Sequence, residues 1–261
     1  MPSFKESQRN PTILKKLFPL TPMLAVLTLA GFLLFPGDLP ALEGNGNKQL
    51  CGLFSAKMGG ANQTRYFSTT GDKILDGQLA AEGNRLSREF KIRPGLKIIE
   101  GNNAFAKGKT VVNGTRGTVA LGRELLFSEL NKNRRGWGGL VIAGIMAHEF
   151  AHIYQFFNGY RDRLLKGSNT VEPLELHADF LAGYHLGLKR RQGSKMDIGA
   201  FMDGAYMIGD KNTNQYQHHG TPQERRRAVR EGYRMGINGV RVGVAAEKGV
   251  EVVGQIMKIK F

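Results

Sequence analysis

The stretch IMAHEFAHIYQFF, residues 145–157, places side chains suited to metal chemistry inside an otherwise apolar segment. His148, Glu149 and His152 form the pattern H-E-x-x-H. Residues four positions apart on a helix project in nearly the same direction, so both imidazoles could bind one tetrahedral metal ion. Glu149 would project from beside that face, where it can reach a metal-bound water. A metal would also give the buried imidazoles a partner, which they need because burying an unpaired polar group is costly.

A catalytic zinc site needs a third protein ligand and an open position for water. The best candidate lies 23 residues after His152, in the segment EPLELHADF. Glu175 and Asp179 are four residues apart there and share a helix face. We assign Glu175 as the third ligand and Asp179 as the acceptor for an N–H of a ligating imidazole, which fixes its tautomer. The alternative is a solvated acidic face near a helix N-terminus, where carboxylates are favoured anyway. His177 projects from another side and is interpreted as a packing or surface residue.

Two helices would position these residues. The first covers residues 139–157, and its apolar side chains occupy nearly every face, which is typical of a buried helix. Its length approaches that of a membrane span, but the charged motif in its middle and the preceding Arg134 and Arg135 make that interpretation the weaker one. The second helix begins near Asn169 or Thr170, either of which can cap it, with Pro173 tolerated in the first turn.

The rest of the chain predicts an α+β fold. Before the central helix we expect a helix over 73–90, three or four short strands between 96 and 122, and a helical segment over 123–131. After the second helix, the segment up to residue 214 has little pattern, residues 221–236 predict a polar helix, and residues 240–261 suggest terminal strands. The expected architecture is a small twisted, mostly antiparallel sheet packed on the H-E-x-x-H helix, followed by the helix that carries the glutamate ligand.

Residues 1–42 have the composition of a targeting segment. A positive leader precedes an apolar run from Met23 to Phe35, and Pro36, Gly37 and Pro40 then interrupt the chain. A cleaved secretory signal has this organisation; an uncleaved N-terminal anchor and a buried core helix are the other interpretations. Either of the first two would export the rest of the chain, which would be periplasmic, secreted or anchored by this segment. Residues 43–48 are expected to be a linker and residues 49–261 one domain.

Composition limits the partners. The chain has 261 residues, 41% hydrophobic and 23% charged, so disorder throughout is excluded. The net charge is +15, and +13 remains if residues 1–42 are removed, which favours association with an anionic envelope surface. The alternative is simply a soluble basic protein. No basic motif interleaved with aromatic residues indicates specific nucleic-acid recognition. The single cysteine, Cys51, excludes an intramolecular disulfide and is interpreted as a small hydrophobic residue.

The segments HEFAH and ELHAD together resemble the gluzincin metallopeptidases. The E-x-x-A-D form is closest to the CAAX prenyl endopeptidase family and its bacterial relatives, and LELHADFLAG is also similar to bacterial neutral zinc metallopeptidases. The resemblance implies a zincin-like metallopeptidase domain in which His148, His152 and Glu175 bind one Zn²⁺. The prenyl endopeptidases have several membrane spans, which this chain lacks.

Two further segments carry the resemblance. NAFA, which comprises Asn103, Ala104, Phe105 and Ala106, resembles the edge strand that pairs with substrate backbone in such enzymes. HGTPQERR, residues 219–226, resembles a downstream segment in which a histidine or arginine faces the reacting carbonyl. His219 would stabilise the oxyanion, with His218 as the alternative.

The expected function is zinc-dependent hydrolysis of peptide bonds outside the cytoplasm, with a metal-bound water as nucleophile and Glu149 as general base. Its substrate would be a peptide or protein; a zinc amidase acting on cell-wall peptides is a variant of this hypothesis. The main alternative is a catalytically inactive zinc-binding module of the cell envelope. A structural protein with an accidental motif is a third hypothesis, and it predicts no metal.

Overall fold

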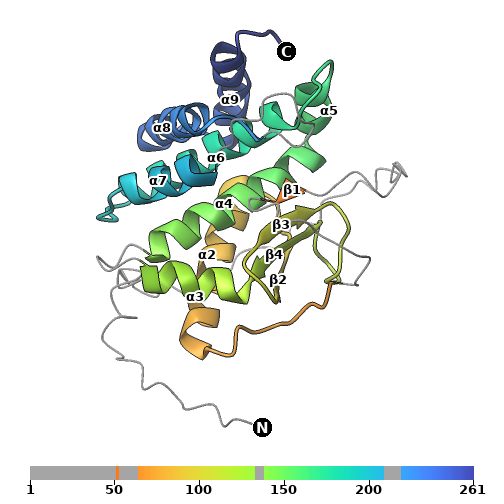
Figure 1. Ribbon diagram of the computed structural model, residues 1–261, viewed down its shortest axis with the longest axis vertical. Coiled ribbons are helices and arrows are strands. Elements are labelled where there is room, and N and C mark those ends of the chain that lie inside the picture. Colours follow the sequence, from red (N-terminus) through yellow and green to blue (C-terminus); the bar gives the residue numbers. More distant parts are fainter. Residues whose placement is uncertain (1–50, 53–63, 133–137, 209–218) are drawn as a thin grey trace, which may run out of the picture.

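The computed structural model describes residues 51–52, 64–132, 138–208 and 219–261. The expected targeting segment, the linker over 43–48 and His218 lie outside these residues, as does the side chain of Cys51. The described part is a mixed α+β fold with a small sheet and several helices (Figure 1). Its elements are β1 (Cys51–Gly52), α2 (Lys73–Phe90), β2 (Gly95–Ile99), β3 (Ala104–Lys107), β4 (Thr118–Gly122), α3 (Arg123–Lys132), α4 (Gly138–Phe157), α5 (Tyr160–Leu165), α6 (Glu172–Arg191), α7 (Gly199–Ile208), α8 (Pro222–Asn238) and α9 (Val242–Met257).

The sheet has four strands in the order β1-β3-β4-β2. β3 is antiparallel to β1 and to β4, whereas β2 is parallel to β4. The expectation of a small, mostly antiparallel sheet before the central helix is therefore confirmed. The parallel pair is possible because residues 100–117, which include β3, connect β2 to β4 and allow β4 to re-enter beside β2 in the same direction.

The expectation that residues 103–106 form an edge strand is wrong for the described chain. β3 pairs on one side with β4 and on the other with β1, where Gly52 faces Phe105 and Cys51 faces Ala106. The backbone positions that a substrate would need for strand addition are thus opposite the chain's own β1. The side chains of Ala104, Phe105 and Ala106 are buried. The strand sequence was recognised correctly, but its neighbour comes from a distant segment that local pattern does not indicate.

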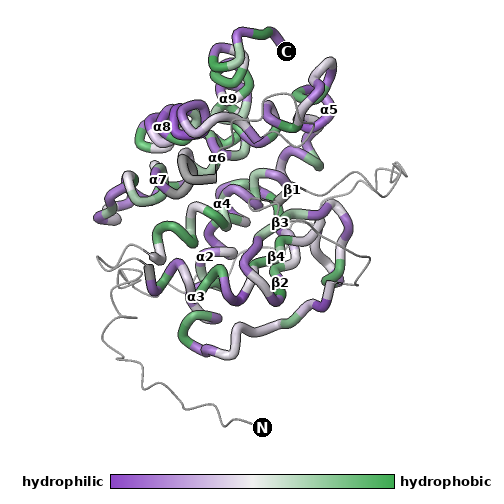
Figure 2. The backbone as a smooth tube through the Cα atoms, viewed as in Figure 1, coloured by the Kyte–Doolittle hydropathy of each residue, from purple (hydrophilic) through white to green (hydrophobic). Residues whose placement is uncertain are grey.

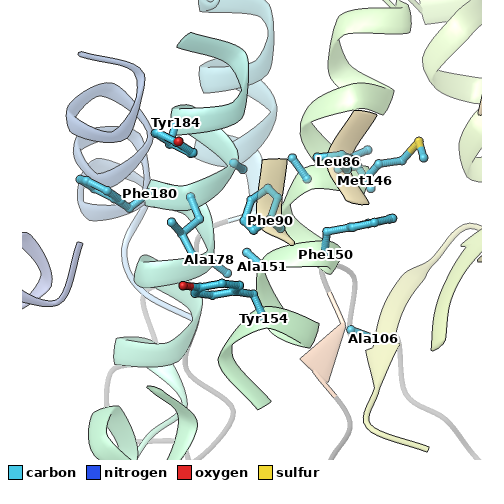
Figure 3. Close-up of a cluster of buried hydrophobic side chains, with 14 of the residues drawn as sticks. Leu86, Phe90, Ala106, Met146, Phe150, Ala151, Tyr154, Ala178, Phe180 and Tyr184 are labelled. Carbon is cyan, nitrogen blue, oxygen red and sulfur yellow. The ribbon is translucent and has the colours of Figure 1, made fainter. Parts of the chain in front are cut away.

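Helix α4 is the central element of the fold. The sheet and α3 lie on one side of it, α6 and α7 contact it from the other, and α2 passes behind it (Figure 1). Figure 3 shows Phe90 of α2 between Phe150 of α4 and Ala178 of α6, and the ring of Tyr154 of α4 lies with its centroid 5.9 Å from that of Phe90. α4 is long and apolar enough to cross a membrane, but most of it is buried in this core. Burial on all sides explains why its apolar residues cover every face.

Helices α6 and α8 approach each other backbone to backbone. Gly183 and Gly187 of α6 face Gly232 and Gly236 of α8, and a Cβ at any of the four would lie within 2.2 Å of a carbonyl oxygen of the other helix. Only glycine permits this separation. The close packing holds the N-terminal part of α8 beside the part of α6 that carries Glu175 and Asp179.

Helix α8 is the polar helix that the sequence predicts, and Figure 2 shows it as largely hydrophilic. It begins with a capping box: the Thr221 side chain accepts from the Glu224 backbone N–H, and the Glu224 side chain accepts from the Thr221 N–H. Gly220 precedes the cap at φ +92, a conformation that favours glycine. The entry to α8 is thereby fixed next to His219.

Two expectations about secondary structure are wrong. Residues 242–257 form helix α9 rather than strands: the buried positions include 242, 245, 246, 249, 250, 253 and 256, which follow the helical period, although valine and glycine are common there. Two helices lie where the sequence predicts no element: α7 occupies part of the segment with little pattern, and α5 follows α4 almost directly. Helix α6 begins at Glu172 with Val171 as its N-cap residue, so neither Asn169 nor Thr170 is the N-cap; the Thr170 hydroxyl nevertheless accepts from the Glu172 backbone N–H at 3.4 Å.

Candidate metal centre

Three buried side chains form a group that could hold a metal ion. His148 and His152 project from α4 and Glu175 from α6, and their ligand atoms all lie within 4.8 Å of one another. His148 Nε2 is 3.0 Å from His152 Nε2, and each of these nitrogens is 3.4 Å from a carboxylate oxygen of Glu175. All three side chains are fully buried. The structure therefore brings together the three residues that the sequence analysis selects as ligands.

The geometry and chemistry of this group fit a tetrahedral metal. Zinc–ligand bonds of about 2.0–2.1 Å at tetrahedral angles place neighbouring ligand atoms roughly 3.3–3.4 Å apart. The three observed separations of 3.0, 3.4 and 3.4 Å are close to that value. Both oxygens of Glu175 are buried without a hydrogen bond among the described residues. A buried carboxylate in this condition is energetically costly, and a cation beside it would compensate that cost.

His148 is oriented by a carboxylate. Its Nδ1 lies 2.9 Å from Asp179 Oδ1, and an ionised carboxylate can only accept, so Nδ1 carries the proton. Nε2 is then the atom directed toward His152 and Glu175. This is the contact that the sequence analysis expects of Asp179.

Asp179 is in turn held by a buried arginine. Arg225 of α8 donates from Nε to Asp179 Oδ2 at 2.6 Å and from Nη2 to Oδ1 at 2.9 Å. Burial opposes ionisation of Asp179, but the charge and hydrogen bonds of Arg225 outweigh it and lower the pKa of the carboxyl. The sequence does not predict this contact: the resemblance of the segment HGTPQERR implies only that a histidine or arginine there faces the reacting carbonyl, whereas Arg225 pairs with Asp179.

His152 is oriented by a neutral amide. Its Nδ1 lies 2.8 Å from Gln155 Oε1, one helical turn further along α4. Gln155 Nε2 reaches the Leu174 carbonyl at 2.8 Å and His177 Nδ1 at 3.0 Å. Gln155 is visible in the sequence as a polar residue in the apolar stretch, but its partners come from α6 and could not be read from spacing. The interpretation of His177 as a packing residue is confirmed and its surface alternative is wrong, since the side chain is fully buried.

The two histidines respond oppositely to this environment. Burial opposes protonation of His148, but the hydrogen bond to Asp179 and the nearby carboxylate of Glu175 outweigh burial and raise its pKa to about 9. Burial lowers the pKa of His152 to about 4. The charge of Glu175 opposes this shift, and the charge of His148 adds to it. Burial also opposes the charge of Glu175, yet the surrounding histidines, led by His152, hold its pKa well below the usual range.

Glu149 and His219 are two further residues that the sequence analysis connects with the candidate metal centre. Glu149 follows His148 on α4, is fully buried and lies within electrostatic range of Arg225. His219 enters from the segment before α8, with Nδ1 3.3 Å from Glu175 Oε2 and its side chain 15% exposed. Of the two histidines considered for this position, the structure places His219 beside the centre.

A second buried ionic cluster lies further along α6. His185 contacts Glu82 Oε1 at 2.7 Å through Nε2 and Glu89 Oε2 at 2.5 Å through Nδ1, and Lys189 donates to both oxygens of Glu82. Both imidazole nitrogens are engaged in opposite directions. The cluster therefore links α2 to α6 and is not arranged to bind a metal.

Comparisons of the chain with protein-family models, with curated proteins and with solved structures found no match.

Proposed function

We propose that the protein is a zinc metallopeptidase that hydrolyses peptide bonds. The convergence of His148, His152 and Glu175 on one point, with the buried Glu149 adjacent in α4 to the first of them, is the observation that carries the proposal. A purely structural zinc site would use a fourth protein ligand in place of an open position. Among the described residues, the ligand group comprises three side chains.

Zinc is favoured over other divalent ions because two imidazoles and one carboxylate are a donor set typical of catalytic zinc. When bound, it would supply Lewis acidity, which polarises a carbonyl and lowers the pKa of water. The arrangement supports a zincin-like reading of the fold: a sheet packed on one side of the H-E-x-x-H helix and a following helix that supplies the glutamate.

The chain's own residues would perform the proton transfers. Glu149 would take a proton from the attacking water and later deliver it to the leaving amine. His219, at the partly exposed side of the centre, would donate a hydrogen bond to the oxyanion. Asp179 and Gln155 would hold the ligating imidazoles in the required tautomers.

The substrate would be an unstructured peptide or protein segment, and the reaction would take place outside the cytoplasm. Export is supported by the organisation of residues 1–42, with a positive leader followed by an apolar run. The high positive charge supports association with an anionic envelope surface.

The experiment compares the purified full-length chain with Glu149→Gln. Both proteins should bind about one zinc per chain, measured by mass spectrometry, because Glu149 is not a ligand. Only the wild type should cleave casein; loss of a general base commonly lowers the rate by about 10²–10⁴-fold. Equal cleavage by the two proteins would overturn the assignment. Zinc binding without cleavage by the wild type would instead favour a zinc-binding envelope module.

A further inference from the structure

We infer that His177 and the Ala246 carbonyl, acting through Gln155, are the positioning group that fixes the tautomer and orientation of the metal ligand His152. The hydrogen-bonded chain runs from α4 through α6 to α9. His152 Nδ1 contacts Gln155 Oε1 at 2.8 Å, Gln155 Nε2 contacts His177 Nδ1 at 3.0 Å, and His177 Nε2 contacts Ala246 O at 2.9 Å. The consequence for zinc binding rests on the proposed function; the tautomer assignment does not.

The donor and acceptor roles along this series of hydrogen bonds follow from its last contact, between His177 and the Ala246 carbonyl. The carbonyl oxygen of Ala246 can only accept, so His177 Nε2 must carry a proton. A second proton on Nδ1 would face the amide N–H of Gln155, so Nδ1 is the acceptor. The two hydrogens of Gln155 Nε2 are then both used, one toward His177 and one toward the Leu174 carbonyl.

The amide orientation determines the state of His152. If the amide were reversed, Gln155 Oε1 would face the Leu174 carbonyl, and two acceptors would oppose each other. Because Gln155 Nε2 donates to the Leu174 carbonyl and to His177, Gln155 Oε1 faces His152 and accepts from His152 Nδ1–H. The lone pair of His152 therefore lies on Nε2, the atom 3.0 Å from His148 Nε2 and 3.4 Å from Glu175. Two backbone carbonyls on separate helices thus impose the ligating tautomer.

The packing around His177 supports a fixed position for this ring. The imidazole is fully buried and stacks on Tyr160 with ring centroids 5.2 Å apart. Gly249 of α9 leaves room for it, since a Cβ there would lie 2.8 Å from His177 Cδ2. Tyr160 also donates to Glu247 of α9 at 2.8 Å. α9, which contributes no ligand of its own, is joined to the metal centre by this route.

The first test needs no variant. Long-range ¹H–¹⁵N correlation spectra of the full-length chain labelled with ¹⁵N-histidine distinguish Nδ1–H from Nε2–H tautomers. His177 should be in the Nε2–H form and His152 in the Nδ1–H form, both without metal and with Zn²⁺ added. A His152 that carries its proton on Nε2 in the metal-free protein, or a His177 in the Nδ1–H form, would overturn the inference.

A matched pair of substitutions separates the two contacts of His177. The amide oxygen of His177→Asn can replace Nδ1 and keep the contact with Gln155, whereas the amide of His177→Gln can replace Nε2 and keep only the contact with Ala246. Removing an orienting partner of a ligand typically lowers metal affinity about 10–100-fold, so we expect a loss in that range for Gln155→Leu and near its lower end for His177→Gln. His177→Asn should retain nearly the wild-type affinity, as should the control His185→Gln, which alters another fully buried histidine of α6.

Zn²⁺ affinity is measured by competition with a chelator. Unchanged affinity in a folded Gln155→Leu protein, or equal affinities for His177→Asn and His177→Gln, would overturn the positioning role while leaving the metal site intact. If the wild type binds no zinc, the proposed function fails, and the tautomers in the metal-free protein still decide this inference.

Discussion

Arg225 donates hydrogen bonds to both carboxylate oxygens of Asp179, at 2.6 and 2.9 Å, and both side chains are almost completely buried. The same carboxylate accepts a hydrogen bond from His148 Nδ1–H. One arginine at the start of α8 is thus connected to the orientation of a ligand on α4, although the two residues are 77 positions apart in the sequence. We therefore expect the stability of the fold and the geometry of the candidate metal centre to depend on the same ion pair.

Arg225→Leu is expected to destabilise the protein by about 3–5 kcal/mol, because it leaves the charge of Asp179 buried without its main partner. Urea unfolding of the full-length chain measures this change. The neighbouring Arg226→Leu is the control: Arg226 pairs with Asp203, both side chains are substantially exposed, and the expected change is within about 1 kcal/mol. Similar losses for the two variants would show that the buried pair has no special contribution.

The glycines between α6 and α8 give a second prediction. In Gly232→Ala the new Cβ would lie 1.8 Å from the Phe180 carbonyl oxygen, so the helices must separate. Overpacking typically costs about 1–3 kcal/mol, and more where backbone must move.

Gly77→Ala is the matched control for this substitution. Gly77 also lies in a helix but has nothing within 4 Å of its Cβ position, so alanine there should stabilise the protein by roughly 0.5–1 kcal/mol. Thermal unfolding shows whether each substitution lowers or raises the stability of the protein. A stabilised Gly232→Ala would mean that the close approach of α6 and α8 is not required.

The cluster of His185 with Glu82 and Glu89 predicts a pH dependence of stability. Its other charged neighbours are Lys189, which contacts Glu82, and Arg85, whose Nε is 4.0 Å from Glu82. Burial opposes the charge on His185, but the carboxylates of Glu89 and Glu82 raise its pKa above the ordinary value. A raised pKa stabilises the fold fully below the unfolded-state value of about 6.5, and the contribution is lost as the pH rises through the folded-state pKa.

Unfolding of wild type and His185→Gln at several pH values measures this contribution. The difference in free energy of unfolding should be largest near pH 6 and should decrease in alkaline solution. Glu82 contributes to stability in a different pH range. Burial opposes its charge, but chiefly His185 lowers its pKa to about 2. Its contribution is therefore lost only as the pH falls from about 4.5 toward 2. A difference that is constant from pH 6 to alkaline pH would show that His185 is not charged in the fold.

The parts of the centre that lie on single helices could be predicted from the sequence. His148 and His152 share a face because they are four residues apart, and the same spacing joins Glu175 to Asp179. The apolar surroundings of the first pair also indicate burial. Local periodicity determines these relationships, and the structure shows them as expected.

The parts that depend on packing between distant helices could not be predicted. Arg225 reaches Asp179 only because glycines bring α8 against α6, and His177 reaches Ala246 only because α9 packs over α6. The sequence of α9 favours strands, so it gives no indication of the contact between Ala246 and His177. Similarly, β1 covers β3 through a pairing between segments about 50 residues apart.

The most direct test of the central claim is the zinc content of the purified full-length chain beside that of Glu175→Ala, both measured by mass spectrometry after zinc is offered and the excess removed. The three-ligand centre predicts about one zinc per wild-type chain and a sharp reduction in the variant, since one of the ligands is lost. A wild-type chain without zinc, or a variant that retains all of it, would contradict the account.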